Sequence, residues 1–164
     1  AQLSRGLGDV YKRQTLLEGK VIQHGKTLDV YNKPNNLDSA KVFSDPPMNI
    51  AEINKKGEFC SLLTEEVNWK TNLNLRDGKY KVGIRPHNIT TYKEGKNSIE
   101  INGKVLISEL SGSESLIHFT NGDLNWVSLS EGIHQKGVGE QTKLFMNADE
   151  FLYFDNNNQL VGNV

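Results

Sequence analysis

Apolar and polar residues alternate in short stretches along most of the chain from about residue 48 onward. The clearest stretch runs from Lys79 to Arg85, and Pro86 ends it. Successive side chains on a strand point to opposite faces, so this period of two predicts strands with one buried face. The pattern predicts strands over 48–53, 58–63, 79–85, 99–110, 116–119, 124–129, 142–146 and 151–154. Many short strands separated by Gly and Asn turns are typical of a small β-barrel or sandwich.

Two turns and two aromatic residues add detail to this prediction. Asn121-Gly122-Asp123 predicts a tight hairpin, because Asn and Gly tolerate positive φ. Ser111-Gly112-Ser113 predicts another turn, in which Gly112 supplies a backbone angle that other residues resist. Within 99–110, we expect Val105 and Ile107 on one face of the strand. Trp69 and Trp126 are expected to pack in or beside the core rather than to stack on a ligand.

The residues before 48 follow a different pattern. Thr27 is a candidate N-cap for a short helix with apolar Leu28, Val30 and Tyr31, and Pro34 ends that helix. A second helix is expected from 36 to 43, followed by the stiff linker Asp45-Pro46-Pro47. Residues 15–46 would then form an α/β piece too small for a core of its own, and 47–164 a β domain. Residues 1–14 fit neither part, and we expect them to be a non-native or disordered tail.

Composition and charge exclude some classes of function. The 164 residues carry a net charge of −1, so the concentrated excess of Lys and Arg expected of a nucleic-acid binder is missing. Cys60 is the single cysteine, which excludes an intrachain disulfide and a cysteine metal cluster. No apolar run approaches the roughly 20 residues of a membrane helix.

The sequence shows no catalytic set. The histidines at 24, 87, 118 and 134 lack the i, i+4 spacing of a helical zinc pair. Asp149-Glu150 is an adjacent pair, and on a strand such neighbours point to opposite faces, so we do not expect paired catalytic carboxylates. A G-x-x-x-x-G-K-[ST] phosphate loop does not occur in the sequence. We therefore expect no enzymatic activity, no cofactor and no metal in this chain.

Five segments, in the same order along the chain, resemble maltose-type ABC importer ATP-binding subunits. The segment from Leu17 to Gly25 is similar to the strand and turn that close the family's nucleotide-binding domain, and Thr27 to Asn36 to the helix that follows. Ser44 to Asn49 resembles the entry into the C-terminal domain. Gly83-Ile84-Arg85-Pro86-His87 is similar to the family's Gly-x-Arg-Pro-Glu motif, with His87 at the position of Glu, and Leu110 to Glu114 to its Leu-Gly-Ser-Glu turn.

This resemblance implies a mainly β fold. An oligonucleotide/oligosaccharide-binding-like (OB-like) small β-barrel of the TOBE type would follow a short α/β remnant of the ATPase domain. The function implied is the regulatory and dimerisation region of the ATP-binding subunit of a bacterial sugar, polyol or glycerol phosphate importer. ATP and Mg would belong to the intact parent. The partners implied are a second ATP-binding subunit, identical or not, membrane permease subunits reached through the ATPase domain, and a regulatory protein. The location implied is the cytoplasmic face of the plasma membrane.

The motifs also supply the candidate interface and regulatory residues: Arg85, His87, Gly112, Ser113 and Glu114. Arg85 is expected either to contact a subunit or regulator or to form a salt bridge at the barrel rim. His87 offers a group that titrates near neutrality, and Glu114 is expected to accept hydrogen bonds in its turn. The alternative hypothesis is a free-standing TOBE-like module that binds a small ligand or an oxyanion. A single-strand nucleic-acid binder is a third, which the near-neutral charge disfavours.

Overall fold

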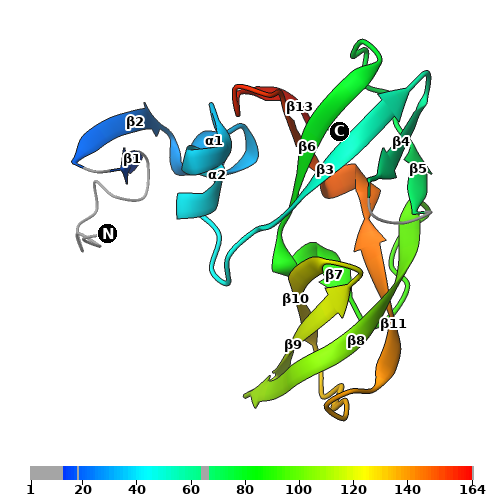
Figure 1. Ribbon diagram of the computed structural model, residues 1–164. Coiled ribbons are helices and arrows are strands. Elements are labelled where there is room, and N and C mark those ends of the chain that lie inside the picture. The colour runs from blue at the N-terminus through cyan, green and yellow to red at the C-terminus, as the bar shows by residue number, and fades with distance from the viewer. Residues whose placement is uncertain (1–12, 18, 64–66, 164) are drawn as a thin grey trace.

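The computed structural model describes residues 13–17, 19–63 and 67–163. The expected tail lies outside these residues, except that Arg13 and Gln14 belong to the first strand. A hairpin and two short helices come first, and they project from one side of a larger β region (Figure 1). These first elements are β1 (Arg13–Leu17), β2 (Lys20–Gly25), α1 (Thr27–Asn32) and α2 (Leu37–Val42). No helix among the described residues is long and apolar enough to cross a membrane.

Two antiparallel sheets form the β region. The six-stranded sheet has the order β13-β12-β6-β3-β4-β5, with β3 (Asn49–Lys56), β4 (Phe59–Leu62), β5 (Asn68–Lys70), β6 (Gly78–Ile84), β12 (Leu152–Phe154) and β13 (Leu160–Asn163). The five-stranded sheet has the order β10-β9-β8-β11-β7, with β7 (Ile89–Thr90), β8 (Ser98–Ser111), β9 (Glu114–Asn121), β10 (Leu124–Glu131) and β11 (Gln141–Asn147). Two single-turn 3₁₀ helices, η2 (Pro86–Asn88) and η3 (Ala148–Glu150), connect them.

The five-stranded sheet curls until its edge strands almost meet. The backbone N–H of Thr91, just after β7, donates to Ser130 Oγ on β10 over 3.0 Å. This contact nearly closes the sheet into a barrel, because β7 and β10 are its two edges. The mainly β, OB-like fold class expected from the sequence is confirmed.

One core fills the space between the sheets. It includes Ile53 and Val82 from the six-stranded sheet and Phe119 and Leu144 from the five-stranded one. Side chains alternate along β9 between buried and partly exposed positions, as the period-two pattern predicts. Trp69 and Trp126 are both buried in this core, so the structural role expected of them is confirmed. Every strand predicted from residue 48 onward exists, and β5, β7 and β13 are additional short ones in that part of the chain.

The two tight turns have the expected glycine geometry. Ser111 pairs with Glu114 and Asn121 with Leu124, so each hairpin has a two-residue loop. The first loop residue has positive φ in both, at +61° for Gly112 and +56° for Gly122. This is the geometry that favours Gly at the first position of a hairpin turn, because a Cβ resists it.

Two local predictions are wrong. A β-bulge between Val105 and Ile107 shifts the register of β8 against β9. Val105 is therefore 1% exposed and Ile107 48% exposed, on different faces. Thr27 is the first residue of α1 and not its N-cap. The cap position is Lys26, which makes no side-chain capping bond, and Thr27 Oγ1 has no partner among the described residues.

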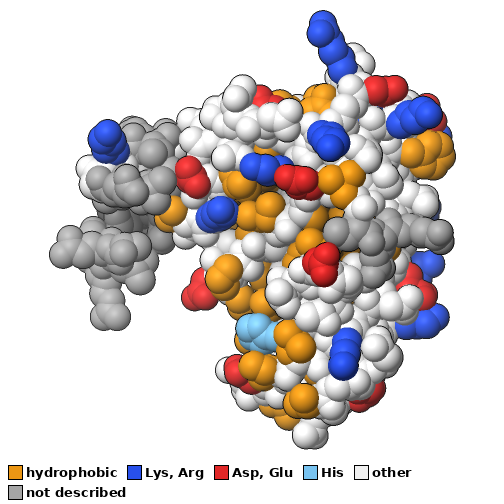
Figure 2. All heavy atoms as spheres, in the orientation of Figure 1, with side chains coloured by type: hydrophobic (Ala, Val, Ile, Leu, Met, Phe, Trp, Pro, Cys, Tyr) orange, Lys and Arg blue, Asp and Glu red, His pale blue; other side chains and the backbone are white. Residues whose placement is uncertain are grey.

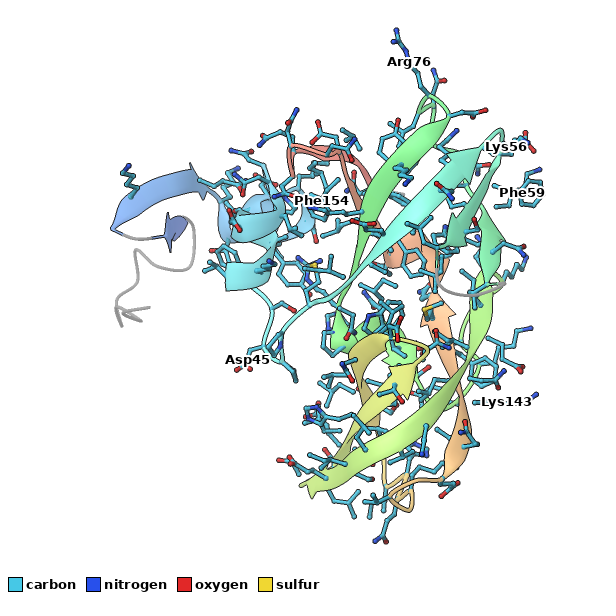
Figure 3. The ribbon with its side chains drawn as sticks, in the orientation of Figure 1. Asp45, Lys56, Phe59, Arg76, Lys143 and Phe154 are labelled. Carbon is cyan, nitrogen blue, oxygen red and sulfur yellow. The ribbon has the colours of Figure 1, made fainter. Side chains whose placement is uncertain are left out.

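Helix α2 packs against the six-stranded sheet and shares a second, smaller core with it. Leu37 and Ala40 of α2 lie against Met48, Leu152 and Phe154, and Figure 3 shows Phe154 directed toward the helices. The Asn36 side chain caps α2 by accepting from Ser39 N at 2.9 Å, as a helix start requires. The Leu37 N–H donates to the carbonyl of Asn158 over 2.8 Å. The helices and the β region therefore pack as neighbours with common contacts.

Candidate functional site

A cleft lies where α1 meets the β region, and we name it the junction cleft. Its volume is ≈ 290 Å³, and its walls come from α1, the β6–η2 connection, η3, β12 and β13. Pro86 builds one wall: it has no N–H to donate, so β6 ends before it and η2 begins at it. This local break leaves Arg85 and His87 facing the end of α1.

Arg85 is the buried charge of the junction cleft, with 5% of its surface exposed. One terminal nitrogen donates to the Tyr31 carbonyl over 2.7 Å. The guanidinium carbon lies 3.8 Å from the centroid of the Tyr31 ring, a cation–π distance. Because the Tyr31 carbonyl belongs to the last turn of α1, Arg85 satisfies an acceptor that the short helix cannot. Burial lowers the pKa of Arg85, which still stays protonated at any ordinary pH.

This environment corrects the expectation of a rim salt bridge. Arg85 forms no ion pair with any residue that the structure describes. A carbonyl and an aromatic ring hold it instead, and its burial leaves little surface for a direct contact with another subunit. Arg85 therefore connects two parts of its own chain.

His87 lies at the mouth of the cleft, on η2. Its Nε2 is 3.4 Å from the Tyr31 hydroxyl oxygen, a long contact. Neighbouring groups withhold water from the ring and lower the pKa of His87. The positive charge of Arg85 lowers that pKa further, while Glu150 opposes both effects. The lowered pKa favours the neutral imidazole, which has one donor and one acceptor nitrogen.

Two carboxylates line another part of the cleft. Asp149 and Glu150 lie on η3, so the assumption that they sit on a strand is wrong. Asn97 Nδ2 donates to Asp149 Oδ1 over 2.7 Å, which fixes that side chain. Glu150 acts electrostatically on Arg85 and His87. It makes no ion pair within 4.0 Å among the described residues, so no salt bridge joins it to Arg85 or His87.

The other candidate residues form the β8–β9 turn. Gly112 and Ser113 are exposed loop residues, and the Ser113 carbonyl accepts from Gly132 N. Glu114 lies directly opposite Glu131 on β10, and both are exposed. The expected hydrogen bonds to the Glu114 carboxylate are not found within the described part of the chain. The turn is therefore set by backbone geometry rather than by that side chain.

Several exposed apolar side chains lie on the strand that leads into this turn and on the segment beside that strand. The segment after β10 runs along β8, since Lys136 N donates to Ser108 Oγ over 3.3 Å and Gly139 N to the Val105 carbonyl over 2.7 Å. The exposed apolar residues of this region are Leu106, Ile107 and Leu110 on β8 and Ile133 and Val138 in the segment beside it, and we call them together the β8 patch. The strand register places Ile107 and Leu110 on opposite faces of β8, so the patch wraps around the strand end. Figure 2 shows hydrophobic side chains collected over β9, β10 and the nearby end of β8.

The five candidate residues thus belong to two places. Arg85 and His87 line the junction cleft, and Gly112, Ser113 and Glu114 border the β8 patch. No hydrogen bond or ion pair joins the two groups in the described ranges. Sequence reasoning missed Tyr31 and Glu150, because the wall that faces Arg85 comes from segments far apart in the chain. It also missed the β8 patch, which depends on the bulge between Val105 and Ile107.

No protein-family model matches this chain. Three curated relatives do, and each is an ATP-binding protein of an import or transport system. The chain is 24% identical to the xylose/arabinose import ATP-binding protein XacK of Haloferax volcanii, over 84% of its own length and 38% of the relative. It is 23% identical to the multiple sugar-binding transport ATP-binding protein MsmK of Streptococcus mutans, over 84% and 39%. It is 32% identical to the sn-glycerol-3-phosphate import ATP-binding protein UgpC 3 of Rhizobium etli, over 64% and 28%.

These matches cover most of the chain but only a part of each relative. The chain spans about two fifths of the length of the first two.

Proposed function

We infer that this chain, which is similar over most of its length to the C-terminal region of ATP-binding subunits of sugar-type ABC importers, forms the regulatory and dimerisation region of such a subunit. In this proposal the intact parent couples ATP hydrolysis, with Mg, to the import of a sugar, polyol or glycerol phosphate. The residues described here would not hydrolyse ATP. The subunit would act at the cytoplasmic face of the membrane beside its permease partners.

The observation that carries the dimerisation part is the β8 patch. Five large apolar side chains are exposed along the second half of β8 and the loop beside it, and Ile133 and Val138 are 73% and 79% exposed. Contiguous exposed apolar surface on a soluble domain marks interaction sites, because covering it removes it from water. A second copy of the subunit is the partner that the family resemblance supplies.

Sedimentation of the 164-residue chain tests this role. We expect concentration-dependent self-association, and we expect the double substitution Ile133→Asp and Val138→Asp to weaken it by at least about tenfold, since a buried carboxylate loses its water. Leu28→Asp is the matched control, because Leu28 is 71% exposed on α1, away from the patch. A chain that stays monomeric at high concentration would contradict dimerisation through this region.

A further inference from the structure

We propose that the junction cleft is a binding site for a small neutral polyhydroxylated solute, held between Arg85 and His87 on one wall and Glu150 on the other. The inference goes beyond the proposed function in naming a ligand site, and it rests on that function only for its regulatory meaning. Binding itself is a property of the chain that can be measured without the importer.

The first support is the incomplete hydrogen bonding of a buried charge. A guanidinium has five N–H donors, and Arg85 is paired through its terminal Nη2 to the Tyr31 carbonyl. Its Nε is buried and without a partner among the described residues. Unsatisfied donors on a buried charged group are costly, so such a group favours an added acceptor oxygen.

The second support is the separation of opposite charges. Glu150 lines the same cleft as Arg85 and His87, yet no ion pair joins it to either of them in the described structure. A solute with neighbouring hydroxyl groups meets both walls at once. Each hydroxyl donates one hydrogen bond, here to a carboxylate, and accepts others, here from Arg85 or His87.

The charge of the cleft decides against an anion. Arg85 contributes one positive charge, Asp149 and Glu150 contribute two negative charges, and the neutral form of His87 contributes none. The net charge of these groups is negative, so it would repel a phosphate or other oxyanion. The free energy that the anion loses on leaving water would therefore not be fully recovered in the cleft. The oxyanion ligand of the alternative hypothesis does not suit this cleft, whereas an uncharged solute carries no such penalty.

Size and position limit the ligand further. The ≈ 290 Å³ of the cleft lies at the lower end of small-molecule pockets, so one sugar ring or short polyol fits and an oligosaccharide does not. Tyr31 comes from α1 and Glu150 from the β region, so a bound solute would tie the helical segment to the β region. Binding of the solute would then influence the domain of the intact subunit to which α1 belongs.

Titration of the 164-residue chain by NMR tests the site. The probes are D-xylose and glycerol, with inorganic phosphate and glycine as the anionic and zwitterionic comparisons. We expect saturable shifts of the His87 ring signals with at least one of the two polyhydroxylated probes. Glu150→Ala should weaken that binding by about tenfold or more, since a hydrogen bond to a charged acceptor is lost. Glu150 is exposed, so this variant should fold.

Glu114→Ala is the matched control, because it removes an exposed glutamate at the β8–β9 turn, and it should leave binding unchanged. Saturation by glycine or phosphate alone would overturn the neutral ligand class. Silence with all four probes, or binding that Glu150→Ala leaves intact, would overturn the site. Sedimentation of the same samples reports self-association separately, so failure of this proposal is distinguishable from failure of the proposed function.

Discussion

Two buried ionisable side chains stand out at the scale of single residues. Burial raises the pKa of Cys60 from 9.0 to about 11. Burial also raises the pKa of Tyr153 from 10.0 to about 12, and its hydroxyl accepts from Trp69 Nε1 over 2.8 Å in the core. Both groups therefore stay protonated in the folded chain at a pH where the unfolded chain has lost these protons.

We predict that stability falls at alkaline pH for this reason. Each group contributes fully to the free energy of unfolding when the pH is below the pKa that the group has in the unfolded chain. This contribution declines as pH rises from 9.0 to about 11 for Cys60 and from 10.0 to about 12 for Tyr153, because the unfolded state then binds fewer protons. A pKa difference of one unit corresponds to about 1.4 kcal/mol. Urea unfolding at a series of pH values measures the slope.

Cys60→Ala isolates one of these groups. Its unfolding free energy should be lower at neutral pH, because a packed side chain is shortened, but it should fall less steeply between about pH 9 and pH 11. A variant with the same slope as the original chain would contradict the assignment of that slope to Cys60.

At the scale of elements, the tight turns fix how consecutive strands pair. Gly112 is exposed, and a Cβ added to it would meet no atom within 4 Å. Its φ of +61° is the remaining obstacle to a side chain. Gly112→Ala should therefore lower the free energy of unfolding by about 1–2 kcal/mol through the backbone alone.

Gly137→Ala is the control for this prediction. Gly137 has no positive φ, and its nearest contact to an added Cβ is 3.6 Å. It should change stability by less than about 0.5 kcal/mol in the same denaturant experiment. Equal effects of the two substitutions would show that the β8–β9 turn does not require glycine.

Strand pattern and turn chemistry predicted most elements, because both act over a few residues. The alternation along 79–85 placed β6, and Gly122 placed the β9–β10 turn. The bulge at Ile107 was not predictable in this way, since it depends on the register of β8 against β9. A single extra residue there moves a large side chain from the core to the β8 patch. The strands β5 and β7 are too short to give a sequence pattern, and only their pairing with neighbouring strands defines them.

At the scale of the whole molecule, the two parts of the chain share packing. Leu37 is buried against Leu152 and Phe154, so unfolding of α2 also removes packing contacts from the β region. Leu37→Ala should lower the free energy of unfolding by about 2–4 kcal/mol. Fluorescence of the buried Trp69 and Trp126 should report this loss, although both belong to the larger core and Leu37 to the smaller one.

Leu28→Ala is the matched control on α1. Leu28 is 71% exposed, so the loss should stay below about 0.5 kcal/mol. If Leu37→Ala left the unfolding transition of the tryptophans unchanged, the helices would unfold independently of the β region. The second core would then contribute nothing to the stability of the β region.

The sequence by itself determined the strands, the glycine turns, the two short helices and the order of motifs that connects the chain with importer ATP-binding subunits. These features depend on side-chain period, backbone preference and local order, which act within a few residues. The tertiary structure alone decided the surroundings of Arg85. Tyr31 is 54 residues away along the chain, and Glu150 is farther still. Burial, opposing charge and the cleft between them arise only when the fold brings those segments together, because electrostatic and packing forces depend on distance in space.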